Sequence, residues 1–282
     1  MDEAALEATY RLEDSHWWFM GMRRVAASLL EQGLSHHRGR VLDVGCGAGG
    51  NLALLSRYGA AHGLDVSSYA LGLCRTRYAL PLVRGSAHAL PFGDGSFALV
   101  AVFDVLYQLA PESEASALGE IRRVLAEGGL FFWREPAYRW LYSSHDRAVG
   151  GRHRYTVGEL RSKLSAAGFR VERATYANSL LFPLIAARRL LHKLPPGRAI
   201  PLRGSPGPGG MGRKGRGQSD LVPVPGPLNR AFMAMLALEA LAVKRLSLPF
   251  GLSAVVVARK RGLAAGHAYE PSQPPCPDTE GT

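Results

Sequence analysis

The sequence predicts an α/β protein built on a seven-stranded, mostly parallel sheet with helices on both faces. Two observations lead to this fold class: short apolar runs alternate with amphipathic segments, and the last run follows a long insertion. Alternating strands and helices favour a parallel sheet with right-handed crossover connections. The chain has 282 residues, 47% of them hydrophobic, so it can bury a large core.

The predicted strands are apolar runs that end at glycines, acidic residues or turn residues. The run FALVAVFDV at 97–105 is apolar almost throughout, as expected for a strand that is buried on both faces. In chain order, the expected strands cover residues 40–45, 60–66, 80–86, 97–105, 130–136, 169–177 and 252–261.

The predicted helices are marked by caps and terminal glycines. Thr156 followed by Glu159 is the signature of a capping box at the start of the helix 156–168. The helix 113–129 is expected to end at its double glycine. The other expected helices cover residues 51–59, 67–79, 179–193 and 227–246.

This pattern divides the chain into a sheet core and several additions. Residues 195–227 hold 8 Pro and 9 Gly, which predicts a mobile loop inside the insertion. An antiparallel last strand would place the insertion over the ligand face of the sheet, as a cap; the alternative is a pair of helices that only pack. The expected parts are an N-terminal helical lid (1–37), the sheet core (38–178), the helical cap insertion (179–250), the last strand (251–262) and a disordered tail (263–282).

Positive charge is concentrated in one late segment. The net charge is +11, and residues 186–262 carry 14 Lys and Arg against 2 Asp and Glu. The partners of such a segment are anionic lipid, here at the inner membrane face, a phosphate-bearing substrate or nucleic acid; the alternative is a solvated surface. Nucleic acid is disfavoured as a partner, because the segment lacks the interleaved aromatic residues that stack on bases.

Composition and cysteine usage exclude several classes of protein. No apolar run reaches the roughly 18 residues of a spanning helix, and the acidic N-terminus does not resemble a signal peptide. The three cysteines, Cys46, Cys74 and Cys276, are too few and too scattered for a disulfide framework or a metal site. We therefore expect a cytoplasmic protein without a metal.

A glycine-rich turn, VLDVGCGAGGN at 41–51, lies between the first strand and the first crossover helix. Glycines at such a turn let the backbone approach a ligand closely and leave the N–H groups of the helix start free. Gly45, Gly47 and Gly50 also fit the G-x-G-x-x-G spacing of dinucleotide-binding proteins. A nicotinamide-dependent oxidoreductase is therefore one hypothesis for this chain.

Two carboxylates favour a different ligand. Asp43 stands two residues before the first glycine, where it would repel a pyrophosphate and suit a positively charged group. Asp65 ends the second strand, where a carboxylate can accept both hydroxyls of a ribose; the alternative is an acid that caps the next helix. A ligand with a ribose, an amino group and no phosphate is S-adenosylmethionine, which we expect as the cofactor.

These residues resemble the Rossmann-like (class I) S-adenosylmethionine-dependent methyltransferases. The resemblance covers roughly residues 38–178, and the segments at 16–24 and 152–160 are similar to a bacterial branch of that family. The segments that carry it are VLDVGCGAGGN at 41–51, HGLDVSSYAL at 62–71, GSAHALPFGDGSF at 85–97, VFDVLYQL at 102–109 and LAEGGLFFWREP at 125–136.

The resemblance implies that residues at the ends of the first four strands bind the cofactor. The glycine turn would cradle the methionine part, the acids would hold the amino group and the ribose, and the residues after the third strand would line the adenine. Ser86 departs from the family, which often has an acid there, and Tyr107 and Gln108 stand where a histidine is frequent. The expected cofactor-binding residues are Asp43, Gly45, Cys46, Gly47, Gly49, Asp65, Val66, Ser86, Ala87, Asp104 and Val105.

The implied reaction is in-line transfer of a methyl group to an O, N or C atom of a small-molecule or lipid- or glycan-linked acceptor. Because the leaving group is a neutral thioether, the protein must mainly align the reactants, exclude water and, for some acceptors, take up a proton. The candidate catalytic residues are His153 and His145 as bases, with Tyr107 as an orienting group. A further hypothesis is a non-catalytic protein that keeps the fold and binds a membrane or a partner.

Overall fold

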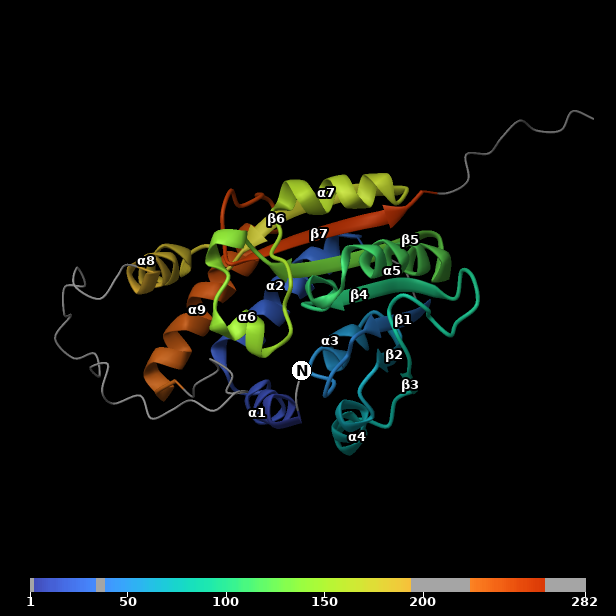
Figure 1. Cartoon of the computed structure of the whole chain (residues 1–282), viewed down its shortest axis with the longest axis horizontal. Coiled ribbons are helices and arrows are strands. Elements are labelled where there is room, and N and C mark those ends of the chain that lie inside the picture. Colours follow the sequence, from blue (N-terminus) through green and yellow to red (C-terminus); the bar gives the residue numbers. More distant parts are fainter. Residues whose placement is uncertain (1–2, 34–38, 194–223, 262–282) are drawn as a thin grey trace, which may run out of the picture.

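One mixed sheet forms the centre of the computed structural model, which describes residues 3–33, 39–193 and 224–261 (Figure 1). The strand order is β3-β2-β1-β4-β5-β7-β6, and β7 runs antiparallel to both of its neighbours. The predicted seven-stranded, mostly parallel sheet is confirmed, and the last strand has the antiparallel direction that was considered as one possibility. The strands are β1 (Gly39–Val44), β2 (Gly59–Asp65), β3 (Leu82–Arg84), β4 (Phe97–Phe103), β5 (Leu125–Pro136), β6 (Phe169–Ala177) and β7 (Ser253–Lys260).

Helices connect the strands and extend the fold at both ends of the core. The helices expected before the sheet and between the sixth and seventh strands are present, whereas α6 and two 3-10 turns, Leu106–Gln108 and Arg139–Leu141, were not foreseen. Residues 194–223 of the predicted loop and the predicted tail lie outside the described residues. The helices are α1 (Glu3–Leu12), α2 (Trp17–Gly33), α3 (Leu52–Leu55), α4 (Ser68–Arg77), α5 (Pro111–Val124), α6 (Ser144–Ala148), α7 (Val157–Ala166), α8 (Phe182–Lys193) and α9 (Gly226–Ala242).

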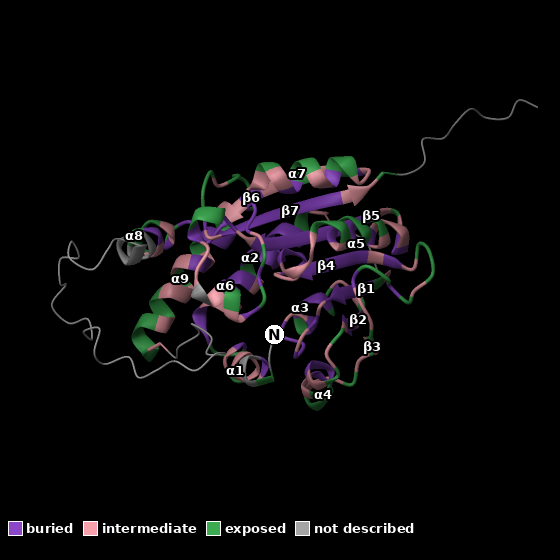
Figure 2. Ribbon diagram, in the orientation of Figure 1, coloured by how far each residue is buried: buried purple, intermediate pink, exposed green. Residues whose placement is uncertain are grey.

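Two hydrophobic layers bury the sheet on both faces (Figure 2). One layer joins α2, α3 and α9 to one face through residues such as Leu30, Leu55 and Ala240. The other joins α5 and α7 to the opposite face through Ile121 and Leu160. The central strands are therefore almost wholly buried, which explains why their sequences are apolar almost throughout.

The end of α5 differs from the prediction. The helix stops at Val124, and β5 already begins at Leu125, which pairs with Phe97 of β4. The double glycine lies inside β5, where Gly128 has a φ of +71°, so it bends the strand instead of ending the helix. The capping box at the start of α7 is confirmed, with the Glu159 N–H donating to Thr156 Oγ1 at 3.2 Å.

The carboxyl ends of the parallel strands meet at one edge of the sheet, as crossover connections require. Beyond this edge lie α1, α6, α8 and α9 (Figure 1). None of the helices in the described ranges is long and apolar enough to cross a membrane. The edge is therefore the place where loops, the N-terminal helices and the insertion come together.

Candidate functional site

Glycine backbone geometry shapes the turn after β1. Gly45, Gly47 and Gly49 have φ values of +77°, +54° and +92°, in the left-handed region that favours glycine. A Cβ on Gly45 would lie 2.5 Å from Val105 Cγ2, whereas a Cβ on Gly47 would meet no atom within 4 Å. The turn is therefore packed at Gly45 and open at Gly47, where a ligand can approach the backbone.

Several N–H groups of this turn already have acceptors within the protein. The N–H groups of Gly45 and Cys46 donate to the carbonyl oxygen of Leu64, at 2.7 and 3.0 Å. The N–H of Gly47 donates to Asp65 Oδ2 at 2.9 Å. The sequence suggested free donors here, but the turn is tied to the end of β2, and these three groups are not available to a phosphate.

Asp65 joins the glycine turn to the start of α4. Its Oδ1 accepts a hydrogen bond from the Ser67 N–H at 2.8 Å, while Oδ2 accepts from Gly47. The cap of α4 is Ser67, whose Oγ accepts from the Ala70 N–H at 3.2 Å, and each Asp65 oxygen still has a second lone pair for a ribose hydroxyl. The adjacent Val66 side chain is 62% exposed, which leaves it accessible at the expected adenine side.

Asp43 is buried two residues before the glycine turn. It is 1% exposed, and its Oδ2 has no hydrogen-bond partner among the described residues. Burial, followed by the negative charge of Asp65, raises the pKa of Asp43 to about 8. A buried, unpartnered carboxyl oxygen beside an open backbone turn fits a ligand that carries a positive charge.

The end of β4 holds an ion pair that sequence reasoning missed. Asp104 has a φ of +57°, and its carboxylate pairs with the buried Arg134 of β5. The guanidinium carbon of Arg134 lies 5.1 Å from the ring centroids of both Trp18 and Phe103. The arginine in the apolar strand sequence LFFWREP was the available signal. It links the predicted methionine end of the site to helix α2.

The turn after β3 supplies a polar edge and a buried anchor. The Oγ of Ser86 and the Nδ1 of His88 are joined by a hydrogen bond of 2.9 Å. Ala87 is 7% exposed and packs into the core. Ser86 and His88, of which the second was not predicted, are therefore the polar groups that this turn offers.

Cys46 fills space inside the glycine turn. A Cβ on Gly63 of β2 would lie 2.8 Å from its sulfur, so the side chain packs against the sheet. A hydrogen bond with Cys74, followed by burial, raises the pKa of the Cys46 thiol. The thiol therefore stays protonated, as expected for a small apolar filler and not for a nucleophile.

Two of the predicted proton-transfer residues are brought together by the backbone. The His153 N–H donates to the Tyr107 carbonyl oxygen at 3.1 Å. The His153 Nε2 lies 3.7 Å from Glu159 Oε1, and its ring centroid lies 4.5 Å from that of Tyr155. Burial lowers the pKa of His153, so the imidazole is neutral at pH 7. His145 belongs to α6.

The side chains of Tyr107 and Glu135 are buried near the same 3-10 turn. Burial raises the pKa of Tyr107 and holds the pKa of Glu135 well above its ordinary value. Glu135 Oε1 accepts hydrogen bonds from the Leu106 N–H at 2.8 Å and the Trp133 indole N–H at 2.7 Å. Glu135 therefore fixes the turn that carries Tyr107.

The N-terminal helices meet the glycine turn where it becomes α3. Glu13, in the connection between α1 and α2, pairs with Arg77 of α4. Arg23 of α2 donates to the Gly50 carbonyl oxygen at 2.8 Å. Burial raises the pKa of Glu13 to about 7. These contacts, none of them foreseen in the sequence, hold the first two helices against the predicted cofactor loop.

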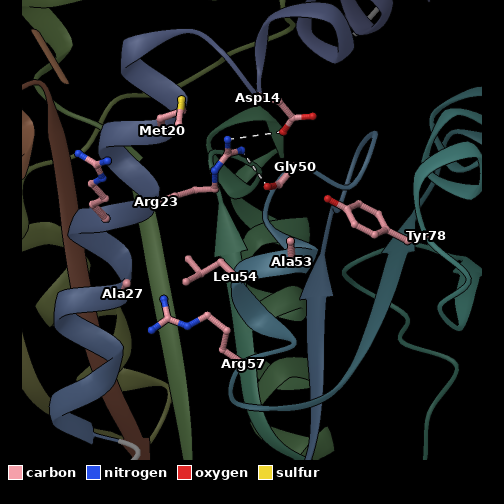
Figure 3. Close-up of a pocket in the computed structure, with 10 residues that line it drawn as sticks. Asp14, Met20, Arg23, Ala27, Gly50, Ala53, Leu54, Arg57 and Tyr78 are labelled. Carbon is pink, nitrogen blue, oxygen red and sulfur yellow. Dashed lines mark hydrogen bonds and ion pairs between the residues drawn. The ribbon is translucent and has the colours of Figure 1, made fainter. Parts of the chain in front are cut away.

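A cavity of about 340 Å³ lies between α2 and α3 (Figure 3). In the view, Arg23 reaches across it to Asp14 and Gly50. The lining includes none of the predicted cofactor residues, so this cavity lies beside the glycine turn and not in front of it. The lining residues are Asp14, Met20, Arg23, Arg24, Ala27, Gly50, Ala53, Leu54, Arg57 and Tyr78.

No cluster of three or more His, Cys, Asp or Glu side chains that could hold a metal ion occurs in the described part of the chain. The polar groups of the site are instead single carboxylates at the ends of β1, β2 and β4. Such an arrangement suits an organic ligand with separate cationic and hydroxyl groups.

Comparison with known proteins agrees with this geometry. Residues 42–133 match the protein family described as a methyltransferase domain. The Haloferax volcanii complex of the Trm112 methyltransferase activator contains a chain with the same fold, at a TM-score of 0.55 and 19% identity, covering 92% of this chain and 97% of that one. The [4+2]-cyclase SpnF has the fold too, at a TM-score of 0.52 and 21% identity over 85% and 81% of the two chains.

Curated relatives are similar over the same region. The fatty-acid O-methyltransferase of Mycolicibacterium smegmatis is 35% identical over 116 residues, 39% of this chain and 42% of that protein. The phthiotriol/phenolphthiotriol dimycocerosates methyltransferase 1 of Mycobacterium ulcerans is 37% identical over 102 residues, 34% and 37% of the two chains. The chain spans less than half the length of the curated relatives it matches.

The fold and the matched family define the class of protein. Over residues 42–133 this chain is similar to a methyltransferase domain, and the seven-stranded mixed sheet is the fold expected from that resemblance. The predicted resemblance is thereby confirmed.

Proposed function

We propose that the protein transfers a methyl group from S-adenosylmethionine to a small-molecule or lipid-linked acceptor. The matched methyltransferase domain supports methyl transfer. Two relatives carry names that specify a fatty acid and phthiotriol/phenolphthiotriol dimycocerosates, which supports an acceptor of this kind. SpnF, a cyclase by name, has the same fold, so the proposal depends on the site and not on the fold alone.

The hydrogen bonds of the glycine turn carry this proposal. Gly45, Cys46 and Gly47 donate their N–H groups to protein oxygens, while Asp43 and Asp65 place carboxylates beside them. A pyrophosphate needs free donors and is repelled by the negative charge of Asp65. A phosphate-free cationic nucleoside meets neither obstacle. The nicotinamide alternative suggested by the glycine spacing is disfavoured for this reason.

Two features of the structure fit S-adenosylmethionine: the Oδ2 of Asp43, which has no partner within the described ranges, and the open space beside Gly47. Asp43 and the Asp104–Arg134 pair would hold the ammonium and carboxylate groups, and Asp65 would accept the ribose hydroxyls. When bound, the cofactor supplies a methyl group on a positively charged sulfur. The protein's part is to align that group and to exclude water.

His153 is the candidate base that the electrostatics favour. Burial keeps its imidazole neutral at pH 7, so it can accept a proton. The raised pKa of Tyr107 leaves that hydroxyl protonated and suited to orienting an acceptor. His145 stays a second candidate because α6 lies beyond the carboxyl edge (Figure 1).

Calorimetric titration with S-adenosylhomocysteine tests the proposal. We expect binding to the unaltered protein. Asp65→Ala should weaken it by about 1–3 kcal/mol, roughly 5- to 150-fold, because polar partners are left unpaired. Asp94→Ala, at an exposed carboxylate, is the control and should bind normally. No heat at high micromolar ligand, from a protein that melts cooperatively, would refute the proposal.

A second candidate is a protein that binds a membrane peripherally without catalysis. It is favoured by the exposed leucines in the second half of α9, Leu238 and Leu241, within the basic segment 186–262. Flotation with anionic liposomes, combined with inactivity on a broad acceptor panel, would support it. Under this candidate, the protein lies in the cytoplasm at the inner membrane face.

A further inference from the structure

Strained backbone marks the carboxyl edge beyond the predicted cofactor residues. Asp104, Tyr138 and Asn178 are the non-glycine residues of the described chain with a positive φ. Each stands one or two residues after the end of a strand, β4, β5 and β6 respectively. Asp and Asn enter the left-handed region readily, but a bulky residue does so rarely. Tyr138, with φ 59° and ψ 117°, is the unusual case.

The strain at Tyr138 is imposed by backbone pairing. Its N–H donates to the Tyr155 carbonyl oxygen at 2.9 Å, and the Tyr155 N–H donates to the Pro136 carbonyl oxygen at 3.0 Å. Strained residues that the surrounding structure holds in place cluster at functional sites. The consequence here is the direction of the tyrosine ring, which stacks on Tyr176 of β6 at 5.0 Å and 17°.

Tyr138 belongs to a group of rings that we name the aromatic patch: Tyr138, Trp140, Phe182 and Phe250. The ring centroid of Phe182 lies 5.6 Å from Tyr138, 6.0 Å from Trp140 and 5.4 Å from Phe250. The members come from the connection after β5, from the start of α8 and from the residues before β7. They are distant in sequence and meet at the same edge of the sheet.

The aromatic patch is open to solvent. Trp140 is 41% exposed and Phe250 43%. Leu180 and Leu184, two residues on either side of Phe182, are 51% and 65% exposed. Grouped apolar side chains on the surface mark binding sites more often than isolated ones do. Trp140 and Phe250 therefore each keep exposed surface that an apolar ligand can contact.

The position of the aromatic patch indicates the shape of that ligand. Asp104, at the predicted methionine end of the cofactor site, follows β4, and the order β4-β5-β7-β6 separates it from the end of β6 by three strand spacings, about 15 Å. A molecule that reaches both places must be elongated, with its reacting atom near β4 and an apolar part over β5 to β6.

We propose that the aromatic patch binds the aliphatic chain of the acceptor. This inference rests on the proposed methyl transfer and narrows the acceptor to molecules with a long alkyl chain. Trp140, Phe250 and Leu184 would cover that chain, and Tyr138, fixed by its backbone, would form the rigid floor. The patch determines acceptor affinity and takes no part in cofactor binding.

Titration of the full chain with decanoate and with butyrate tests the inference. The two probes share a carboxylate and differ in chain length. Decanoate should bind and butyrate should bind at least tenfold more weakly. The double variant Leu184→Ser, Phe250→Ser should weaken decanoate at least tenfold and leave S-adenosylhomocysteine affinity within twofold. Leu228→Ser, a comparably exposed leucine (45%) at the start of α9, should change neither.

Each adverse result has its own meaning. The inference is overturned if decanoate and butyrate bind the unaltered protein equally well. It is also overturned if decanoate binds the double variant as tightly as it binds the unaltered protein. Light scattering that shows a dimer for the unaltered protein and a monomer for the double variant overturns it too, because the patch would then be an interface between copies. Failure of S-adenosylhomocysteine to bind while decanoate binds at the patch refutes the proposed function separately.

Discussion

Replacing Asp43 with asparagine should change how the stability of the protein depends on pH. In the folded chain, burial and the nearby Asp65 raise the pKa of Asp43 from 3.8 to about 8. The unfolded chain releases the same proton near pH 4. Between these values the folded state binds more protons than the unfolded state, so stability falls as the pH rises.

The size of the effect follows from the pH range. From pH 5 to pH 8 the unfolded carboxyl is ionised while the folded one is largely protonated. Each pH unit in this range costs about 1.4 kcal/mol, which gives a loss on the order of 3 kcal/mol for Asp43 alone. Asparagine keeps the shape and does not titrate, so Asp43→Asn should lack this component.

Urea unfolding at pH 5 and pH 8 measures the difference. The free energy of unfolding of Asp43→Asn, relative to the unaltered protein, should rise by about 3 kcal/mol between the two values. Other titrating groups, Glu13 among them, are common to both proteins and cancel. Asp94→Asn, at an exposed carboxylate, is the matched control. If the free energy of unfolding depends on pH identically in all three proteins, the folded Asp43 carboxyl is already ionised between pH 5 and pH 8.

The same carboxyl connects stability to ligand binding. A positively charged ligand group near Asp43 favours its ionised form, so S-adenosylhomocysteine should release a proton when it binds near pH 7. Calorimetry in two buffers of different ionisation heat detects that proton. Asp43→Asn should bind without proton release. Buffer-independent heats in the unaltered protein would place the ligand's amino group elsewhere.

Three further changes test other parts of the structure. Gly47→Ala should lower stability by only about 1–2 kcal/mol, because its Cβ meets no atom within 4 Å, yet abolish S-adenosylhomocysteine binding in calorimetry; normal binding would remove the turn from the site. Arg154→Ala breaks a buried bidentate pair with Asp146, at 2.8 and 3.0 Å, and should lower the unfolding free energy by about 3–5 kcal/mol, measured in urea; a loss below 1 kcal/mol contradicts it. Thr156→Ala removes a helix cap and should cost about 1 kcal/mol, whereas Thr156→Ser should restore the midpoint.

The sheet could be predicted because burial of a strand on both faces leaves a recognisable pattern in its sequence. A strand covered on both faces must be apolar almost throughout, and FALVAVFDV showed this directly. The end of α5 could not be predicted in the same way. Its double glycine is compatible with a helix end or a bent strand, and only the pairing of Leu125 with Phe97 decides between them.

The glycine turn of the candidate site could be predicted, because each glycine acts through its own backbone and needs no partner from another element. The glycines at positions 45 and 47 indicated a turn that needs a freely adjustable backbone, and both have positive φ angles. Pairs that form across elements were not predictable: Glu13 meets Arg77, and Arg134 meets Asp104, only after helices and strands are placed. Such contacts depend on the three-dimensional register, which the sequence pattern does not contain.

The last residues of β5 place side chains on both faces of the sheet at its carboxyl edge. Successive residues of a strand point to opposite faces. Arg134 turns toward the face covered by α2, where it holds Asp104 beside the predicted cofactor site. Glu135 turns toward the opposite face, where it holds the turn that carries Tyr107. The strand then continues to the strained Tyr138 and the aromatic patch. We expect the cofactor on the Arg134 side of the sheet and the acceptor on the Glu135 side. A shift of one residue in the register of β5 would exchange these two side chains. Such a shift should therefore disable the cofactor site and the acceptor site together.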